Sequence, residues 1–303
     1  MVELRRTVRD GSLLLGAPRE WLVANGLGGY ASATITGAIT RRYHGLLIAA
    51  QPPPLGRMVV LEDLEVDIEL EDGSIANMRE KGQFRDFTLN MGLPSWRYEL
   101  DGVVIETSIV VPSRQNIVHF TLRSLSDGRR LRLRLRPLIN FRPLEAPVSE
   151  ALSSDYTLTV RGNRYEISSG PDLPILRLAV EGSEGPIFTA DGGSRRESFY
   201  DTEAHRGYDS RGWLWSPGYF AGGNPQGLPA HPDRSDRGLA YRAGVEPRRC
   251  AEFRRRTPQA SGWDGGSTGA DRICSRARPR RRHLRDYPGR THCRRGPSAC
   301  RGR

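Results

Sequence analysis

The sequence predicts an all-β fold in which two large antiparallel sheets form a sandwich. Between residues 57 and 219, apolar and polar residues alternate in one segment after another, which is the pattern of half-buried strands. Residue pairs that tolerate positive φ separate these segments and favour tight hairpins. Few segments have helical periodicity, and many strands with few helices are typical of a sandwich.

The expected strands follow one another at short spacing. Residues 96–100 and 103–106 flank Asp101-Gly102 and form the clearest hairpin. The other alternating segments are residues 58–70, 105–111, 117–122 and 131–138, and the other turn pairs are Asp72-Gly73, Asp127-Gly128 and Gly162-Asn163.

Leucine and arginine alternate in the segment LRLRLRPL at residues 131–138. Arg132, Arg134 and Arg136 lie on one side of this strand and could form a cationic ladder for nucleic acid. The opposite side is entirely leucine, as an inward face requires. We therefore favour an ordinary sheet with a solvated arginine face.

Positive charge is concentrated in the last part of the chain. Of the 303 residues, 46 are Lys or Arg and 35 are Asp or Glu, which gives a net charge of +11. Residues 221–303 contain 20 arginines and 7 acidic residues, so residues 1–220 are slightly acidic. We predict a β-sandwich domain over residues 1–220 and an Arg/Gly/Pro-rich tail over residues 221–303.

The tail contains few residues that could form a core. Only six of its 83 residues are Val, Ile, Leu or Phe, so we expect it to be largely disordered. It is either a functional basic arm that binds nucleic acid or a segment read out of frame in a GC-rich gene. Because the tail is rich in Arg, Gly, Pro and Ala and lacks lysine, we favour the out-of-frame origin, with the slip near Ala221.

The positions of the cysteines and the hydropathy of the chain indicate where in the cell the protein is expected. All four cysteines lie in the tail, at positions 250, 274, 293 and 300, so residues 1–220 contain no disulfide. The spacing of His283, His292, Cys293 and Cys300 does not match a structural zinc site, and we predict no metal site. The chain has no apolar leader and no apolar run of membrane-spanning length, so we expect a cytoplasmic protein without membrane partners.

A glycine-rich segment at residues 20–32 carries much of the chemical information. Gly26, Gly28 and Gly29 allow a sharp turn or a close approach of the backbone to another surface. The segment lacks the strand-to-helix context of a dinucleotide loop, and no Gly-Lys-Ser/Thr follows it. It is either a structural turn that packs Trp21 and Tyr30 or part of a binding surface.

The sequence Arg41-Arg42-Tyr43-His44 directly precedes an apolar strand. Two guanidinium groups, a phenol and an imidazole suit hydrogen bonding to hydroxyl-rich ligands or carboxylates. A histidine in this setting is more often a structural hydrogen-bonding group than a catalyst. No Gly-x-Ser-x-Gly or His-Glu-x-x-His motif supplies a nucleophile or a metal site.

Aromatic residues gather near the end of the expected sandwich. Trp213 and Trp215 lie on the same side of an expected strand, where they either stack on sugar rings or close the edge of the domain. Acidic residues are plentiful at 62–71, but they mostly alternate as on an exposed face. They do not by themselves identify the two carboxylates that glycoside hydrolysis needs.

Five collinear segments together resemble the N-terminal domain of bacterial and archaeal glycogen debranching enzymes, the amylo-α-1,6-glucosidase family. They are residues 20–50, which read EWLVANGLGGYASATITGAITRRYHGLLIAA, and residues 51–57, 92–122, 132–142 and 205–220. The resemblance implies a β-supersandwich packed against a C-terminal (α/α)6 barrel that holds the catalytic carboxylates. It also implies hydrolysis of α-1,6 branch points of glycogen without a cofactor.

The family continuation is not recognisable after residue 220, so we expect the catalytic barrel to be absent and assign no catalytic residue. The predicted function is that of a glucan-orienting domain, inactive alone, whose partners are α-glucan and the catalytic domain. The alternative is a β-sandwich binding protein whose tail engages nucleic acid, which we consider less favoured. The candidate glucan contacts are Trp21, Asn25, Arg42, Tyr43, His44, Trp213 and Trp215.

Overall fold

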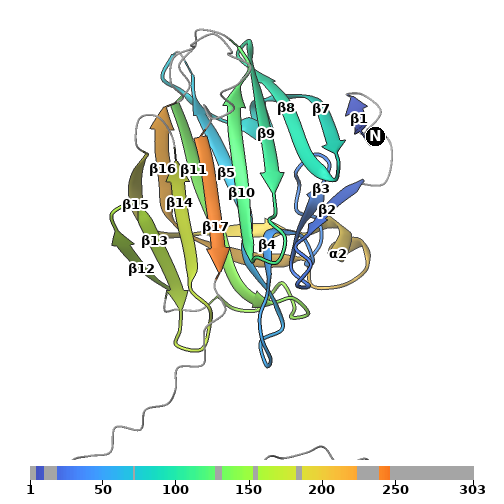
Figure 1. Cartoon of the computed structure of the whole chain (residues 1–303), viewed down its shortest axis with the longest axis vertical. Helices are drawn as coiled ribbons and strands as arrows, with labels where there is room; N and C mark the ends of the chain where they lie inside the picture. The colour runs from blue at the N-terminus through green and yellow to red at the C-terminus, as the bar shows by residue number, and fades with distance from the viewer. Residues whose placement is uncertain are drawn as a thin grey trace, which may run out of the picture. The chain divides into compact units, whose positions relative to one another are not determined.

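The computed structural model describes residues 5–9, 19–70, 72–126, 132–152, 156–181, 186–223 and 239–245. All of these belong to one compact unit, which spans Met1–Glu252. The described residues form two antiparallel sheets and two short helices, which confirms the predicted all-β sandwich (Figure 1).

Sheet A has nine strands. In spatial order they are β1 (Arg5–Arg9), β7 (Gln83–Asn90), β8 (Leu93–Leu100), β9 (Val103–Val110), β10 (Ile117–Ser124), β17 (Leu239–Val245), β14 (Leu176–Glu181), β13 (Arg164–Ser169) and β12 (Tyr156–Arg161). Neighbouring strands pair antiparallel throughout.

Sheet B has eight strands. Seven follow one another as β15 (Ile187–Phe199), β16 (Arg211–Gly223), β11 (Arg132–Pro143), β5 (Arg57–Glu69), β4 (Gly45–Ala50), β3 (Tyr30–Thr34) and β2 (Glu20–Ala24), and β6 (Ile75–Asn77) also pairs with β5. The helices are α1 (Met78–Lys81) and α2 (Asp201–His205).

The predicted turn chemistry is confirmed where the structure describes it. Asp101 and Gly102 have φ values of 51° and 70° and close the β8–β9 hairpin. Gly162 has a φ of 57° and closes the β12–β13 hairpin. The pair Asp127-Gly128 lies outside the described residues.

The arginine side of β11 faces away from the core, with the Arg132 side chain 76% exposed and the Arg136 side chain 13% exposed. Leu133 and Leu135 are buried in the core between the sheets, whereas Arg132 is largely exposed and Arg136 contacts acidic side chains. The carboxylates of Glu69 and Asp191 are the ion-pair partners of Arg132 and Arg136. Because these cations have acidic partners, the structure favours the sheet-face interpretation over a nucleic-acid ladder.

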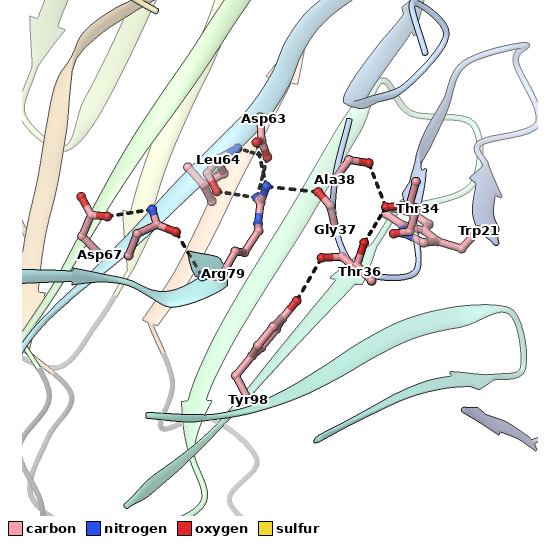
Figure 2. Close-up of polar contacts among 11 residues, drawn as sticks. Trp21, Thr34, Thr36, Gly37, Ala38, Asp63, Leu64, Asp67, Arg79 and Tyr98 are labelled. Carbon is pink, nitrogen blue, oxygen red and sulfur yellow. Dashed lines mark hydrogen bonds and ion pairs between the residues drawn. The ribbon is translucent and has the colours of Figure 1, made fainter. Parts of the chain in front are cut away.

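Helix α1 anchors a partly buried ion pair beside the core. Arg79 forms two hydrogen bonds with the Asp63 carboxylate, at 2.8 and 2.5 Å, and also donates to the carbonyls of Gly37 and Leu64 (Figure 2). Tyr98 of β8 donates to the carbonyl of Thr36, in the same turn as Gly37. This network therefore ties β5, the β3–β4 loop and sheet A together.

Strand β17 corrects part of the predicted domain boundary. Residues 221–223 continue β16, and residues 239–245 form a strand that pairs with both β10 and β14 (Figure 1, orange). Tyr241, Ala243 and Val245 are buried, so this strand contributes to the core. The prediction of disorder does not hold for these residues. The rest of residues 221–303 lies outside the described residues.

The prediction failed at β17 because the apolar content was averaged over the whole tail. A seven-residue strand needs only three inward apolar side chains, and three such residues hardly change the average of an arginine-rich segment. In the described part of the chain, no helix has the length and apolar character needed to cross a bilayer.

Candidate functional site

The Arg41–His44 segment packs against α2 on sheet B. The amide of Thr202 donates to the carbonyl of Thr40 at 3.0 Å, and the amide of Arg42 donates to the Glu203 carboxylate at 3.3 Å. The Glu203 side chain is buried, and its other oxygen lies 3.9 Å from the Arg42 guanidinium. The segment is thus attached to α2 through both backbone and side-chain contacts.

His44 has a structural role. Its imidazole is 2% exposed, its Nδ1 accepts a hydrogen bond from the Thr40 amide, and its Nε2 lies 3.5 Å from the Glu20 carboxylate. Burial lowers the pKa of His44, which favours the neutral ring. Arg41 also pairs with Glu20, at 2.6 Å. His44 therefore holds the turn and offers no face to a ligand.

Arg142, at the end of β11, is the centre of this region, and the sequence analysis did not identify it. Its buried guanidinium donates to the carbonyl of Arg42 at 2.7 Å and to that of Ala146 at 2.9 Å. It also reaches the carbonyls of Pro143 and Leu144, both at 3.4 Å. We call Arg42, Arg142, Glu62, Tyr200 and Glu203 the Arg142 network.

Glu62 is completely buried, which corrects its predicted place on an exposed acidic face. The pairing register of β5 with β11 shifts between Leu138 and Ile139, opposite Glu62, and this irregularity breaks the simple alternation. The Tyr200 hydroxyl donates to the Glu62 carboxyl. Burial raises the pKa of Glu62 to about 7. Since no part of the side chain is exposed, it cannot serve as an acid for a bound sugar.

Trp21 lies in the core, so it is removed from the candidate glucan contacts. Its indole is 4% exposed, donates to the carbonyl of Thr34 and packs edge-on against Trp96. The glycine-rich segment thus places Trp21 as the structural interpretation predicted. A buried indole with its N–H already bonded has no face left for a sugar.

Asn25 links two turns. Its side-chain oxygen accepts hydrogen bonds from the amides of Leu27 and Gly29, and its nitrogen donates to Gln115 and Asn116 in the β9–β10 turn. All of its polar groups are used, which removes it too from direct ligand contact. A Cβ at Gly29 would lie 2.7 Å from the Asn25 amide nitrogen, so the glycine permits this close packing.

Arg42 and Tyr43 reach the surface. The Arg42 guanidinium lies 4.8 Å from the ring centroid of Tyr43 and 5.4 Å from that of Tyr208. The Tyr43 hydroxyl donates to Glu145. Within this small aromatic and charged surface the Tyr43 hydroxyl has a partner, whereas the buried Nε of Arg42 has no hydrogen-bond partner among the described residues.

A groove with an aromatic floor lies where the two sheets end. Strand β12 is the last strand of sheet A and β15 the last of sheet B. Between them Tyr156 and Trp215 stack with their ring centroids 4.4 Å apart and an interplanar angle of 5°. The groove has a volume of about 420 Å³, and its other lining residues include Gly192, Gly193 and Arg195. We call it the aromatic groove.

The aromatic groove depends on an irregularity in β15. Register shifts between Ala190 and Ser194, and both glycines there have positive φ, 79° at Gly192 and 82° at Gly193. A Cβ at Gly193 would lie 2.7 Å from the indole nitrogen of Trp215. The glycines therefore allow the backbone to approach the indole.

Comparison with known families identifies the chain. The family model described as "Glycogen debranching enzyme N terminal" matches residues 19–227, which is more than half of the chain. The chain belongs to this family. The resemblance inferred from the sequence is thereby confirmed, and the match extends past the predicted boundary at residue 220.

Among solved structures, the chain is similar to a bacterial glucoamylase complexed with acarbose. The identity is 8% and the TM-score 0.35, over 80% of this chain and 36% of the glucoamylase. The chain thus spans little more than a third of that enzyme. No curated protein matches the sequence.

The candidate residues lie in separate parts of the molecule. Trp215 lines the aromatic groove, and Trp213, 50% exposed, lies two residues away on the same strand without lining it. Arg42 and Tyr43 lie together near α2. Tyr156 was missed because its role depends on stacking between two sheets. Among the described residues, no group of His, Cys, Asp and Glu could hold a metal ion, and the His and Cys residues at 283–300 lie outside them.

Proposed function

We propose that this chain is the glucan-binding module of a glycogen-debranching glycoside hydrolase, and that a separate catalytic domain of the same enzyme cleaves the α-1,6 branch linkages. Membership of the glycogen debranching enzyme N-terminal family supports the substrate class. The stacked pair of Tyr156 and Trp215 in the aromatic groove is the observation that carries the proposal for the binding site.

The aromatic groove has the chemistry that an α-glucan needs. A flat aromatic face matches the apolar C–H face of a pyranose ring, and Arg195 can donate hydrogen bonds to its hydroxyls. The volume of about 420 Å³ is within the usual range of small-ligand sites. Tyr156 and Trp215 come from different sheets, so the platform is held by the core and needs little reorganisation.

The same groove lacks the chemistry for cleavage. Glycoside hydrolysis uses two carboxyl groups placed on either side of the scissile bond. The described residues that line the groove include no Asp or Glu, and the nearby Asp191 is paired with Arg136. Glu62 and Glu203 are too deeply buried to reach a substrate. These facts support a binding role for this part of the enzyme and a catalytic role for another domain.

Titration calorimetry with maltoheptaose and with a branched limit dextrin tests this function. We expect binding in the micromolar to millimolar range, and a loss of at least tenfold in the variant Trp215→Ala. Ala190→Trp, which places a bulky ring in the groove, should have the same effect without removing the stacked pair. Circular dichroism and the melting temperature of each variant check that the fold is retained.

Trp213→Ala and Tyr43→Phe test the other surface candidates. Both should bind within twofold of the unmodified chain if the aromatic groove is the main site. If Trp213→Ala loses binding and Ala190→Trp does not, the contact lies at Trp213. If the folded chain binds no glucan at millimolar concentration, the proposed function is wrong.

A further inference from the structure

A second groove lies on the outer face of sheet A. It has a volume of about 820 Å³ and shares no lining residue with the aromatic groove. On β17, Arg242 and Gly244 line it and alternate with the core residues Tyr241 and Ala243, and Val245 at the end of the strand also lines it. Ala179 of β14 and Ile117 of β10 also line it, and they point to the same outer face of the sheet.

Four arginines line this groove. Arg164, Arg177 and Arg242 come from β13, β14 and β17, and Arg114 comes from the turn before β10. The described lining residues include no Asp or Glu. Arg177 has a partner in Glu166 at 2.9 Å, but within the described parts of the chain no carboxylate forms an ion pair with the other three. We call this site the arginine groove.

The backbone at Arg114 is constrained. Its φ of 57° lies in the left-handed region, which is uncommon for a residue with a side chain. The Arg114 amide donates to the carbonyl of Asn25 at 2.6 Å, and this bond helps to hold the turn. Such backbone conformations cost free energy and are found preferentially at ligand sites.

Gln51 adds an independent observation that a ligand belongs here. The side chain is only 8% exposed, yet its amide nitrogen has no hydrogen-bond partner, and the residue lines the arginine groove. A buried donor without a partner is costly unless a ligand or water satisfies it. The groove therefore combines guanidinium donors with a buried amide donor and contains no acidic acceptor side chain.

We propose that the arginine groove binds a phosphorylated sugar, either as a free sugar phosphate or as a phosphate ester carried on a glucan chain. Guanidinium groups bind phosphate oxygens with charge-assisted and often bidentate hydrogen bonds. Gln51 and Asn163 can bond to hydroxyls, and the apolar surface of Leu27 and Ile117 suits the C–H face of a sugar ring. The volume is far larger than inorganic phosphate requires, so the sugar is part of the recognised group.

The test is calorimetric titration of the full chain with four probes: glucose 6-phosphate, 6-phosphorylated maltotetraose, inorganic phosphate and unmodified maltotetraose. We expect at least one phosphorylated sugar to bind tenfold or more tightly than inorganic phosphate. Tighter binding of glucose 6-phosphate indicates a free sugar phosphate as the natural ligand, and tighter binding of the phosphorylated oligosaccharide indicates a glucan ester. Equal affinity for inorganic phosphate and both phosphorylated sugars overturns the proposal.

Matched variants separate the groove from the general positive charge of the chain. The double variant Arg164→Gln/Arg242→Gln should weaken the phosphorylated sugar at least tenfold. The control Arg132→Gln/Arg196→Gln removes the same charge from exposed positions on sheet B and should change binding by less than twofold. Gln51→Met should weaken binding several-fold, because the orphan donor is removed. Equal losses in the two double variants would show charge attraction only and overturn the proposal.

This inference stands apart from the proposed glucan function. Trp215→Ala should leave binding of the phosphorylated sugar unchanged, and Arg164→Gln/Arg242→Gln should leave binding of unmodified maltoheptaose unchanged. Either proposal can therefore be disproved while the other is retained. If a short single-stranded RNA displaces the sugar phosphate and loses affinity in the groove variant but not in the control, the groove is a nucleic-acid site and the proposal is wrong.

Discussion

Arginines on the two sheets are used in opposite ways. In the Arg142 network, the Arg142 guanidinium is buried and donates to four backbone carbonyls. In the arginine groove, Arg164 and Arg242 come from β13 and β17, on either side of β14, and no carboxylate in the described residues pairs with them. In the Arg142 network the guanidinium donors bind acceptors within the protein, whereas in the arginine groove they are available to a ligand.

The comparison shows that the hydrogen-bond and ion-pair partners of an arginine decide its role, and that the number of arginines in the sequence does not. Removing a buried guanidinium leaves its acceptors unpaired, and removing the acceptors leaves a buried charge unpaired. Either change lowers the free energy of unfolding strongly. An exposed guanidinium without an ionic partner contributes little to stability and can contribute much to binding. The following predictions test this division, and they begin with the largest expected effect.

Replacing Arg142 should be the most damaging change. Arg142→Leu leaves the carbonyls of Arg42 and Ala146 without a donor and removes the nearby positive charge from Glu62. We expect a loss of about 4 kcal/mol in the free energy of unfolding, measured by urea denaturation. A loss below about 1 kcal/mol would show that the network is not structural and would break the comparison.

Glu62 should give the network a characteristic pH dependence. Its pKa rises from an ordinary value of 4.5 to about 7 because the carboxyl is buried, so the folded state holds a proton that the unfolded state releases. Stability from this group is present below about pH 4.5 and is lost as the pH rises through about 7. The shift corresponds to about 3 kcal/mol.

The variant Glu62→Gln isolates this effect. The amide resembles the protonated carboxyl and can still accept the hydrogen bond from Tyr200. Urea denaturation from pH 5 to pH 8 should show that the variant gains stability relative to the unmodified chain as the pH rises. Parallel pH profiles for the two proteins would mean that Glu62 is ionised in the fold.

The glycine-rich turn that Asn25 holds should show an intermediate effect. Gly29→Ala forces a Cβ to within 2.7 Å of the Asn25 amide nitrogen and of the Ile48 carbonyl. We expect a loss of about 2 kcal/mol, because the hydrogen bonds that join the turn to Asn116 must shift. Thermal denaturation of Gly29→Ala beside Gly26→Ala, which meets no atom within 4 Å but has a φ of 75°, separates crowding from backbone strain. Because Gly29 does not have a positive φ, an unchanged stability of Gly29→Ala would show that the neighbouring groups shift without cost.

Arg242→Gln should have the smallest effect on stability. Since Arg242 is exposed and unpaired with any described carboxylate, we expect a change within about 0.5 kcal/mol in the free energy of unfolding. Loss of phosphorylated-sugar binding at unchanged stability would sharpen the comparison. A stability loss as large as that of Arg142→Leu would remove the distinction between the two regions.

The fold could be predicted from the sequence because its main signals are local. Alternation at Leu133 and Leu135, and turn chemistry at Asp101-Gly102, depend on residues that are close together in the chain. The family was recognisable for a related reason, since its signature extends over collinear segments. Strand β17 was not predicted because the apolar alternation of seven residues is a weak signal within an arginine-rich region.

The candidate sites were less predictable because their members come from distant segments. Trp21 gave the same signal as an exposed sugar-binding indole, and only its contact with Trp96 distinguishes it. Tyr156 acquires its role from Trp215 in the other sheet. Arg142 lies in an otherwise ordinary strand, and the orphan nitrogen of Gln51 is visible only in three dimensions. The adjacent Gly192 and Gly193 were the one local signal that could have indicated the aromatic groove.

The position of β17 also constrains how the protein can be made. The strand is inserted between β10 and β14, although both precede it by a long stretch of chain. On the ribosome, β10 and β14 must therefore wait with unsatisfied backbone edges until residue 245 has left the exit tunnel. A polypeptide whose synthesis stops earlier would expose both edges, and we expect it to precipitate or to require a chaperone.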